Sequence, residues 1–418
     1  MLALALAMTT ASAAQAEDHP LQPLIDAAPE GSVLRVPAGT WTGPVTIAHP
    51  LTLEGPGATL TGNGQGTVIT ITAPGVIIRG LRITASGSSH DGMDSAILVT
   101  ADNVRIESNT IDDALFGVFV RAARNVVVCG NDITSKREDF ALRGDGVRVW
   151  NGSANRVYGN DVHDARDVTL ANTRDNVVAR NRITGGRYGM QLVFAPHNAV
   201  VGNVLDHDLT GIAVLYSNDT LIRGNVIQHS WGPSGTGLTF KESGQAVVED
   251  NLVLHCSVGS RTNAPTSPEA IVTFRHNLFA HNAAGMDFYG ENGGHLIHGN
   301  VFEKNLVTVT VSAAMSARNN DWLGNEWDDY EGFDRNGDGI GDTPHDVYAF
   351  ADRIWQETPH ASFFRNAPAF ELIDFLERLA PFASPSLTLT DPRPVTRDLP
   401  PPQRPDFHPT CLAPPELP

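Results

Sequence analysis

Apolar and polar residues alternate along most of the chain, and the alternation breaks at regularly spaced asparagines. In each copy an apolar residue stands three positions before and another two positions after the asparagine, as in Val200-Val-Gly-Asn203-Val-Leu205. Period-two alternation is typical of β-strands, and asparagine suits a tight corner because it tolerates the left-handed backbone conformation. The asparagines are Asn109, Asn131, Asn160, Asn181, Asn203, Asn225, Asn251, Asn277, Asn300 and Asn320. The pattern predicts short strands joined by repeated corners.

The spacing of these asparagines, 20–29 residues, predicts how the strands are arranged. A unit of this length cannot bury its own apolar face, so neighbouring units must stack. Many copies contain a second strand that begins with glycine, such as Gly211-Ile-Ala-Val214. We therefore predict an all-β fold, a single-stranded right-handed parallel β-helix of the pectin-lyase-like type with short helical caps. Each corner asparagine could then bond to the next rung, and nine gaps would span roughly 43 Å.

The rest of the chain fits around this solenoid. Length alone favours two or three domains, but the repeat indicates a single one. We expect a signal peptide at 1–16, an N-terminal cap and first rung at 17–50, β-helix repeats at 51–330, an Asp/Gly-rich loop and a C-terminal capping helix at 331–383, and a Pro-rich tail at 384–418. The helical spacing falls on residues 369–379, and the tail is expected to be extended and partly disordered. No second apolar run reaches 18 residues, so we expect no transmembrane segment.

Charge and cysteine content narrow the function. The chain has 29 Lys and Arg against 47 Asp and Glu, a formal net charge of -18. That balance argues against nucleic-acid binding, because no basic excess is available for phosphates. The signal peptide, ending at Ala14-Gln15-Ala16, indicates export. In an oxidising compartment Cys129, Cys256 and Cys411 could form one disulfide, and the sequence leaves the pairing open.

Stacking turns equal offsets into vertical columns, and one column is rich in histidine. Four residues after consecutive asparagines stand His207, His229, His255 and His281. Imidazole suits copper and zinc, and sulfur suits Cu(I), so this column is a candidate copper site; the alternative is a solvated polar stack at a corner. Met190 follows a strand glycine and favours the core over a ligand role. Met93 stands beside Asp91 and Asp94 in a loop-like stretch and is the better placed methionine.

A second candidate metal site lies near the end of the repeats. The run Asp334-Arg-Asn336-Gly-Asp338-Gly-Ile-Gly-Asp342 matches the opening of a calcium-binding loop, with oxygen ligands at its first, third, fifth and ninth positions. His345 replaces the bidentate glutamate at the twelfth position, and no flanking helix pair is evident. We therefore expect either a calcium ion that staples the loop or a metal-free loop rich in Asx turns.

Polysaccharide degradation is the main catalytic alternative, because β-helices often act on acidic polysaccharides. The outward column two positions before each asparagine has no aspartate cluster beside a basic residue, which a calcium-dependent lyase needs. The net charge of -18 would also repel polyuronates. We expect no enzymatic activity, with a carbohydrate-binding or polysaccharide-modifying β-helix as the alternative, and an inert structural interaction protein as a third possibility.

Four segments together are specific to one protein family. They are Gly324-Asn-Glu-Trp-Asp-Asp-Tyr-Glu-Gly-Phe-Asp-Arg-Asn-Gly-Asp-Gly-Ile-Gly-Asp342 with Thr343-Pro344, Arg187-Tyr-Gly-Met190, Trp231-Gly-Pro233 leading to Gly237-Leu-Thr-Phe-Lys241, and the helix ending from Leu372 to Pro381. On these matches the sequence from about residue 20 to 385 resembles the NosD family, periplasmic proteins that mature nitrous oxide reductase. The resemblance implies a periplasmic accessory protein that works with an ABC transporter permease. It would pass transiently bound copper from a lipoprotein chaperone to the reductase's copper centre.

The chain departs from the family pattern at three positions. Members typically have histidine and methionine where this chain has Gln191 and Val193, and often histidine where it has Arg148. If those outward residues bind copper in the family, part of that site is replaced here, or the chain serves a related system.

Overall fold

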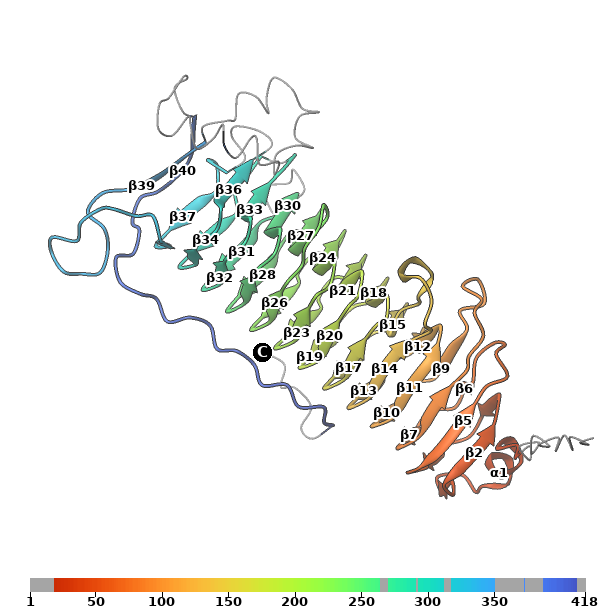
Figure 1. Ribbon diagram of the computed structural model, residues 1–418. Helices are drawn as coiled ribbons and strands as arrows, with labels where there is room; N and C mark the ends of the chain where they lie inside the picture. Colours follow the sequence, from red (N-terminus) through yellow and green to blue (C-terminus); the bar gives the residue numbers. More distant parts are fainter. Residues whose placement is uncertain are drawn as a thin grey trace, which may run out of the picture.

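The computed structural model describes residues 19–263, 270–290, 292–311, 317–349, 372 and 386–411. The expected signal peptide at 1–16 lies outside these residues, and so does the expected capping helix at 369–379 apart from Leu372. The described chain forms a long solenoid in which each turn but the last contributes one strand to each of three parallel sheets (Figure 1). The predicted parallel β-helix is therefore confirmed.

The sheets are built from consecutive rungs in strict order. The first contains β1 (Val33–Arg35), β4 (Thr52–Glu54), β7 (Ile77–Arg79), β10 (Arg105–Glu107), β13 (Val127–Cys129), β16 (Arg156–Tyr158), β19 (Val177–Ala179), β22 (Ala199–Val201), β25 (Leu221–Arg223), β28 (Ala246–Glu249), β31 (Val272–Arg275), β34 (Leu296–His298) and β37 (Asp321–Leu323). The second contains β2 (Gly39–Thr42), β5 (Ala58–Thr61), β8 (Arg82–Thr84), β11 (Thr110–Ala114), β14 (Asp132–Ser135), β17 (Asp161–His163), β20 (Arg182–Thr184), β23 (Val204–Asp206), β26 (Val226–Gln228), β29 (Leu252–Leu254), β32 (Leu278–Ala280), β35 (Val301–Glu303) and β38 (Glu326–Trp327). The third contains β3 (Val45–Ile47), β6 (Ile69–Ile71), β9 (Ser95–Val99), β12 (Phe116–Arg121), β15 (Val147–Trp150), β18 (Asp167–Ala171), β21 (Tyr188–Val193), β24 (Thr210–Leu215), β27 (Thr236–Lys241), β30 (Val258–Asn263), β33 (Ala284–Phe288) and β36 (Val307–Val311).

The core is a narrow apolar column between the three sheets. Each rung sends aliphatic side chains inward, and in one rung Ile222, Ile227 and Leu238 are fully buried. Burying such a side chain contributes about 1.5–3 kcal/mol, so stacking supplies the stability that a single turn lacks. At the N-terminal end the short helix α1 (Gln22–Ala27) buries Ile25 on the first rungs. A 3-10 turn, η1 (Phe140–Leu142), interrupts the loop before β15.

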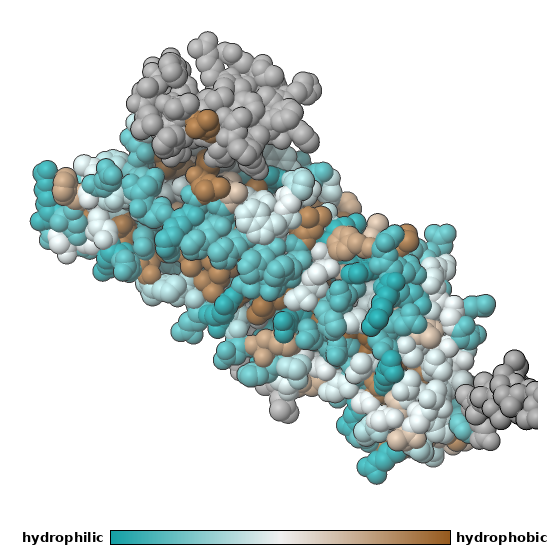
Figure 2. Space-filling view, in the orientation of Figure 1, coloured by the Kyte–Doolittle hydropathy of each residue, from teal (hydrophilic) through white to brown (hydrophobic). Residues whose placement is uncertain are grey.

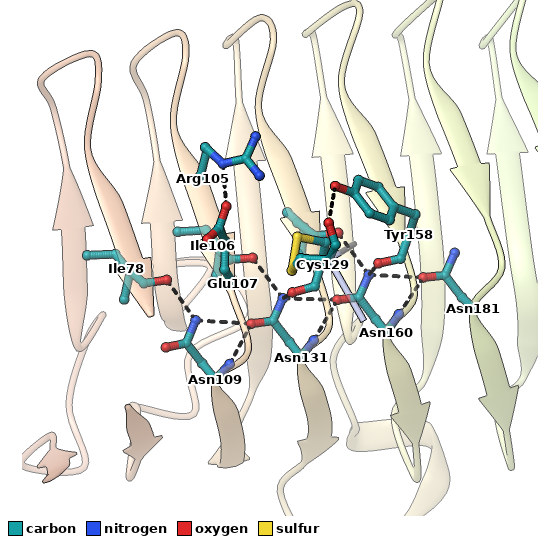
Figure 3. Close-up of a disulfide and its surroundings, with 12 residues drawn as sticks. Ile78, Arg105, Ile106, Glu107, Asn109, Cys129, Asn131, Tyr158, Asn160 and Asn181 are labelled. Carbon is teal, nitrogen blue, oxygen red and sulfur yellow. Dashed lines mark hydrogen bonds and ion pairs between the residues drawn. A yellow bond between two sulfur atoms is a disulfide. The ribbon is translucent and has the colours of Figure 1, made fainter. Parts of the chain in front are cut away.

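A buried ladder of asparagines runs along the corner between the first and second sheets (Figure 3). The side-chain amide of Asn131 donates to Oδ1 of Asn160 over 2.9 Å, and the backbone N–H of Asn131 donates to the same oxygen over 3.0 Å. The same pattern recurs at Asn160 and Asn181. Because every buried amide finds its partner one rung away, the ladder holds the rungs in register.

The prediction that Asn320 is the tenth asparagine of the ladder is wrong. Asn325 continues the ladder, since it accepts the backbone and side-chain N–H groups of Asn300 through its Oδ1. Trp322 and Trp327 take the apolar positions three before and two after it, in register with the preceding rung. Asn320 belongs to a different corner, where it accepts the backbone N–H of His295.

The C-terminal segment returns along the outside of the solenoid. The strand β40 (Ser386–Asp391) pairs antiparallel with β39 (His345–Ala349). Beyond it the chain runs back beside the corner of the asparagine ladder, as the dark-blue trace shows (Figure 1). It ends, among the described residues, at a disulfide between Cys411 and Cys129, while Cys256 is free and buried. Residues 386–411 are extended but attached to the β-helix, which the sequence did not indicate.

Candidate functional site

The four histidines of the predicted column stand at the corner between the second and third sheets. Each follows a strand of the second sheet directly and has a left-handed backbone, with φ of 58°, 59°, 53° and 57° for His207, His229, His255 and His281. Histidine is among the residues enriched in that conformation. Each of these corner residues also donates its backbone N–H to a carbonyl of the next rung. The repeat therefore fixes where each imidazole leaves the backbone.

The imidazole rings form a continuous stack. Neighbouring ring centroids lie 4.7, 5.4 and 5.0 Å apart along the column. The His207 side chain is 71% exposed and that of His229 is 36% exposed. On the face drawn in Figure 2 hydrophilic residues dominate, with hydrophobic ones scattered among them. The structure thus brings the four predicted histidines together on an accessible edge.

Asp206 joins this column, and the sequence analysis missed it. Its Oδ1 lies 2.8 Å from Nδ1 of His207 and 2.7 Å from Nδ1 of His229. Burial raises the pKa of Asp206, but hydrogen bonds from His229 and Gln228 and the charge of His207 outweigh it and hold the pKa below its ordinary value. Among the described residues, these three form the one group of at least three acidic, histidine or cysteine side chains close enough to share a metal ion. The signal was readable, since Asp206 stands three residues after Asn203 at an outward position.

The shared carboxylate sets the chemistry of both rings. A carboxylate at Nδ1 favours the tautomer with hydrogen on that atom, which leaves Nε2 as the metal-binding atom. Among the described residues no carboxylate pairs with His255, and burial and the charges of His281 and His229 lower its pKa. A lowered pKa keeps this imidazole neutral, the form that binds metal. The column therefore offers a neutral ring at His255 and two carboxylate-oriented rings at His207 and His229.

Behind the histidines lies a buried column one residue further along the chain. Burial raises the pKa of the Cys256 thiol to about 11, and the side chain is fully buried, so its sulfur is out of reach of an ion at the surface. Asp208 accepts the backbone N–H of Gly186 through Oδ1, over 2.7 Å. Burial raises the pKa of Asp208 well above its ordinary value. These residues support the corner from inside.

Neither candidate methionine meets the histidine column. Met190 is 1% exposed and packs in the core in register with Val168 and Ile212, so its sulfur faces the apolar interior. Met93 lies in the loop between β8 and β9, on the same corner as His207 but five rungs away. At about 4.8 Å per rung this is roughly 24 Å, too far for a shared ion.

The positions where the family pattern carries histidine or methionine lie on the outer face of the third sheet. Arg148 and Gln191 stand in one register column with Thr169 between them. The Arg148 guanidinium is 3.1 Å from the carboxylate of Asp145. Val193 follows on the same strand as Gln191. Since none of these three side chains is a copper ligand, this face lacks the expected donors.

The Asp/Gly-rich loop folds around its own carboxylates. Asp334 accepts the backbone N–H groups of Gly339, Gly337 and Asp338, which outweigh its slight desolvation and lower its pKa. Asp342 accepts the N–H of Arg335 over 2.7 Å. The Asn336 amide donates to Asp338 over 3.1 Å. These are Asx-turn contacts, and calcium binding at the four expected ligands, Asp334, Asn336, Asp338 and Asp342, stays a prediction.

Comparisons with known proteins show which family models and which relatives this chain resembles. Residues 129–332 match the family model described as periplasmic copper-binding protein (NosD), and residues 57–162 match that of the right-handed β-helix region. A probable ABC transporter binding protein NosD of Stutzerimonas stutzeri is 29% identical over 83% of both chains. A protein of the same description from Pseudomonas aeruginosa is 28% identical over 82% of this chain and 83% of its own.

One solved structure supports the fold, and the fold alone; a second resembles the chain more distantly. A PL6 alginate lyase bound to a trisaccharide has a TM-score of 0.50 and 13% identity, covering 69% of this chain and 82% of its own. The periplasmic alginate epimerase AlgG has a TM-score of 0.47 and 12% identity, covering 70% and 82%. The predicted right-handed course of the β-helix agrees with the matching family model, which is described as a right-handed β-helix region. Among the described residues, no helix is long and apolar enough to cross a membrane.

Proposed function

We propose, from the match of residues 129–332 to the NosD family model, that this chain is a periplasmic copper-delivery protein for the maturation of nitrous oxide reductase. In this role it works with an ABC transporter, receives copper from a lipoprotein chaperone and passes it to the reductase's copper centre. It acts as a binding protein and not as an enzyme. The description of its relatives as ABC transporter binding proteins supports the partnership.

The histidine column with Asp206 carries the proposal. It lies inside the region that matches the NosD family model, and one carboxylate oxygen of Asp206 lies within hydrogen-bond distance of two imidazoles. Imidazole nitrogen is a good copper ligand. The exposed His207 ring can exchange a bound ion with a partner, as a delivery protein requires. Copper is cargo here, and the stacked rings of His229, His255 and His281 extend the binding edge along three further rungs.

Anaerobic Cu(I) titration against a colorimetric chelator tests the proposal on the mature chain. The site variant is His207→Ala with His229→Ala, and a second variant is Asp206→Asn. The matched control is His197→Ala, since His197 is also a left-handed corner residue whose Nδ1 lies 2.7 Å from a carboxylate, that of Asp219. We expect the double variant to weaken Cu(I) binding at least tenfold and Asp206→Asn to weaken it less.

The control should bind copper as the wild type does. Equal stoichiometry and affinity in the wild type and the double variant would refute the site. Failure of the wild-type protein to bind Cu(I) at all would refute copper delivery as its function.

A further inference from the structure

We propose that the Cys129–Cys411 disulfide is a thiol–disulfide exchange site that latches the C-terminal segment, residues 392–411, against the β-helix. We call this segment the strap. The disulfide joins residues 282 positions apart in the sequence, and it ties the end of the described strap to β13, near the middle of the solenoid (Figure 1). The inference does not depend on copper binding.

The N-terminal end of the strap, which we call the upper strap, is firmly held against the last rungs of the solenoid. Asp391, just before it, is fully buried and accepts N–H groups from Gly324, Asn325 and Trp327. A carboxylate only accepts hydrogen bonds, so Asp391 ends the asparagine ladder where the next rung would otherwise be. The backbone N–H of Leu399 then donates to Glu326 over 2.6 Å. These contacts hold the upper strap without the disulfide.

The lower strap, residues 400–411, has few backbone donors. Five of these twelve residues are proline, and proline has no N–H to pair with a neighbouring strand. Most of residues 400–410 are exposed. In this stretch the Arg404 guanidinium contacts the side-chain oxygen of Gln228. Cys411 adds the disulfide and a 3.4 Å hydrogen bond from the Tyr158 hydroxyl to its carbonyl. The disulfide is therefore a covalent anchor of the lower strap.

The C-terminal end of the strap packs closely against buried residues of the first sheet. Cys411 packs against Cys129, Tyr158 and Ala179, which are almost fully buried. Two left-handed glycines allow this close approach, because a methyl group on Gly159 would lie 2.5 Å from the carbonyl oxygen of Thr410 and one on Gly130 would lie 3.2 Å from Cys411 Sγ. If the strap leaves, the apolar surface of Tyr158 and Ala179 becomes accessible.

The two sulfurs differ in access, which sets the direction of exchange. Cys129 is fully buried, whereas Cys411 is partly exposed. A thiolate of an external dithiol attacks Cys411 Sγ, forms a mixed disulfide there and expels Cys129 as a thiolate. The second thiol of the reagent then displaces Cys411 and closes its own disulfide. Two electrons and two protons pass to the protein, the dithiol is oxidised, and Cys129 and Cys411 become free thiols.

Strap opening is testable on the mature chain by chymotrypsin cleavage after Phe407, with dithiothreitol as the dithiol. We expect reduction to add two alkylatable thiols and to speed this cleavage at least tenfold, while the far-UV circular dichroism of the β-helix stays unchanged. Cys411→Ser and Cys129→Ser should be cleaved rapidly without reductant. Cys256→Ser is the matched control and should need reductant, like the wild type.

Three outcomes would overturn the latch. One is a disulfide that dithiothreitol cannot open in the folded protein. Another is a bond that opens with no change in the cleavage rate after Phe407. The third is loss of the β-sheet signal on reduction, which would make the disulfide a general stabiliser of the fold and not a release point for the strap.

Discussion

Replacing Asn203 by alanine tests how much one rung of the asparagine ladder contributes to stability. The Asn203 amide donates to the carbonyl of Val178 over 3.0 Å and to Oδ1 of Asn225 over 2.9 Å. Its own Oδ1 accepts the backbone and side-chain N–H groups of Asn181, both over 2.9 Å. The substitution removes these four hydrogen bonds from a site that water cannot reach, since Asn203 is fully buried.

Each bond contributes about 1 kcal/mol net, so Asn203→Ala should lower the free energy of unfolding by about 4 kcal/mol. Against a total of about 5–15 kcal/mol for an ordinary domain, this is a large loss. Urea unfolding followed by far-UV circular dichroism and by tryptophan fluorescence measures it. The matched control is Asn218→Ala, because Asn218 is exposed and its side chain accepts one N–H, that of Gly244, through Oδ1.

We expect the control to change the free energy of unfolding by less than about 1 kcal/mol, because water can replace the lost acceptor. If Asn203→Ala costs no more than Asn218→Ala, with the same dependence on urea, the ladder does not hold the rungs together. The stability would then come from the aliphatic core alone.

Three further predictions follow from buried and coupled groups. Asp391→Ala should raise hydrogen exchange around Trp327 more than tenfold in mass-spectrometric measurements while rungs far from that end keep their protection. Burial raises the pKa of Asp208 in the folded protein. Its contribution to stability is therefore complete below the unfolded-state pKa of about 3.9 and is lost as the pH rises through the folded-state pKa. As the pH falls from 7 to 4, the melting temperature of the wild type should rise relative to that of Asp208→Asn, and parallel curves of melting temperature against pH would contradict this. NMR titration should place the pKa of His255 below 6.5, and His281→Ala should raise it.

The repeat made most of the fold readable from the sequence. The positions of residues such as Asn203 and Val200 fix strands, corners and stacking, because a 20–29-residue turn has no other way to bury its apolar face. The histidine column followed from the same arithmetic, since equal offsets from the asparagines become equal heights on one corner. The misplacement of Asn320 marks the limit: Ala317 and Trp322 stand at the expected offsets from Asn320, so the pattern alone did not separate it from Asn325, five residues further on.

Contacts between distant segments were decided by the tertiary structure. Sequence offsets placed His207 and His229 one rung apart, but only the fold shows Asp206 reaching both rings and Met93 lying five rungs away. The pairing of Cys129 with Cys411 depends on a strap that returns along the solenoid, and no local pattern specifies that path. In a repeating sequence, equal offsets determine how each turn stacks and pairs with the next turn. The position of a non-repeating segment depends instead on its contacts with the surface of the folded solenoid.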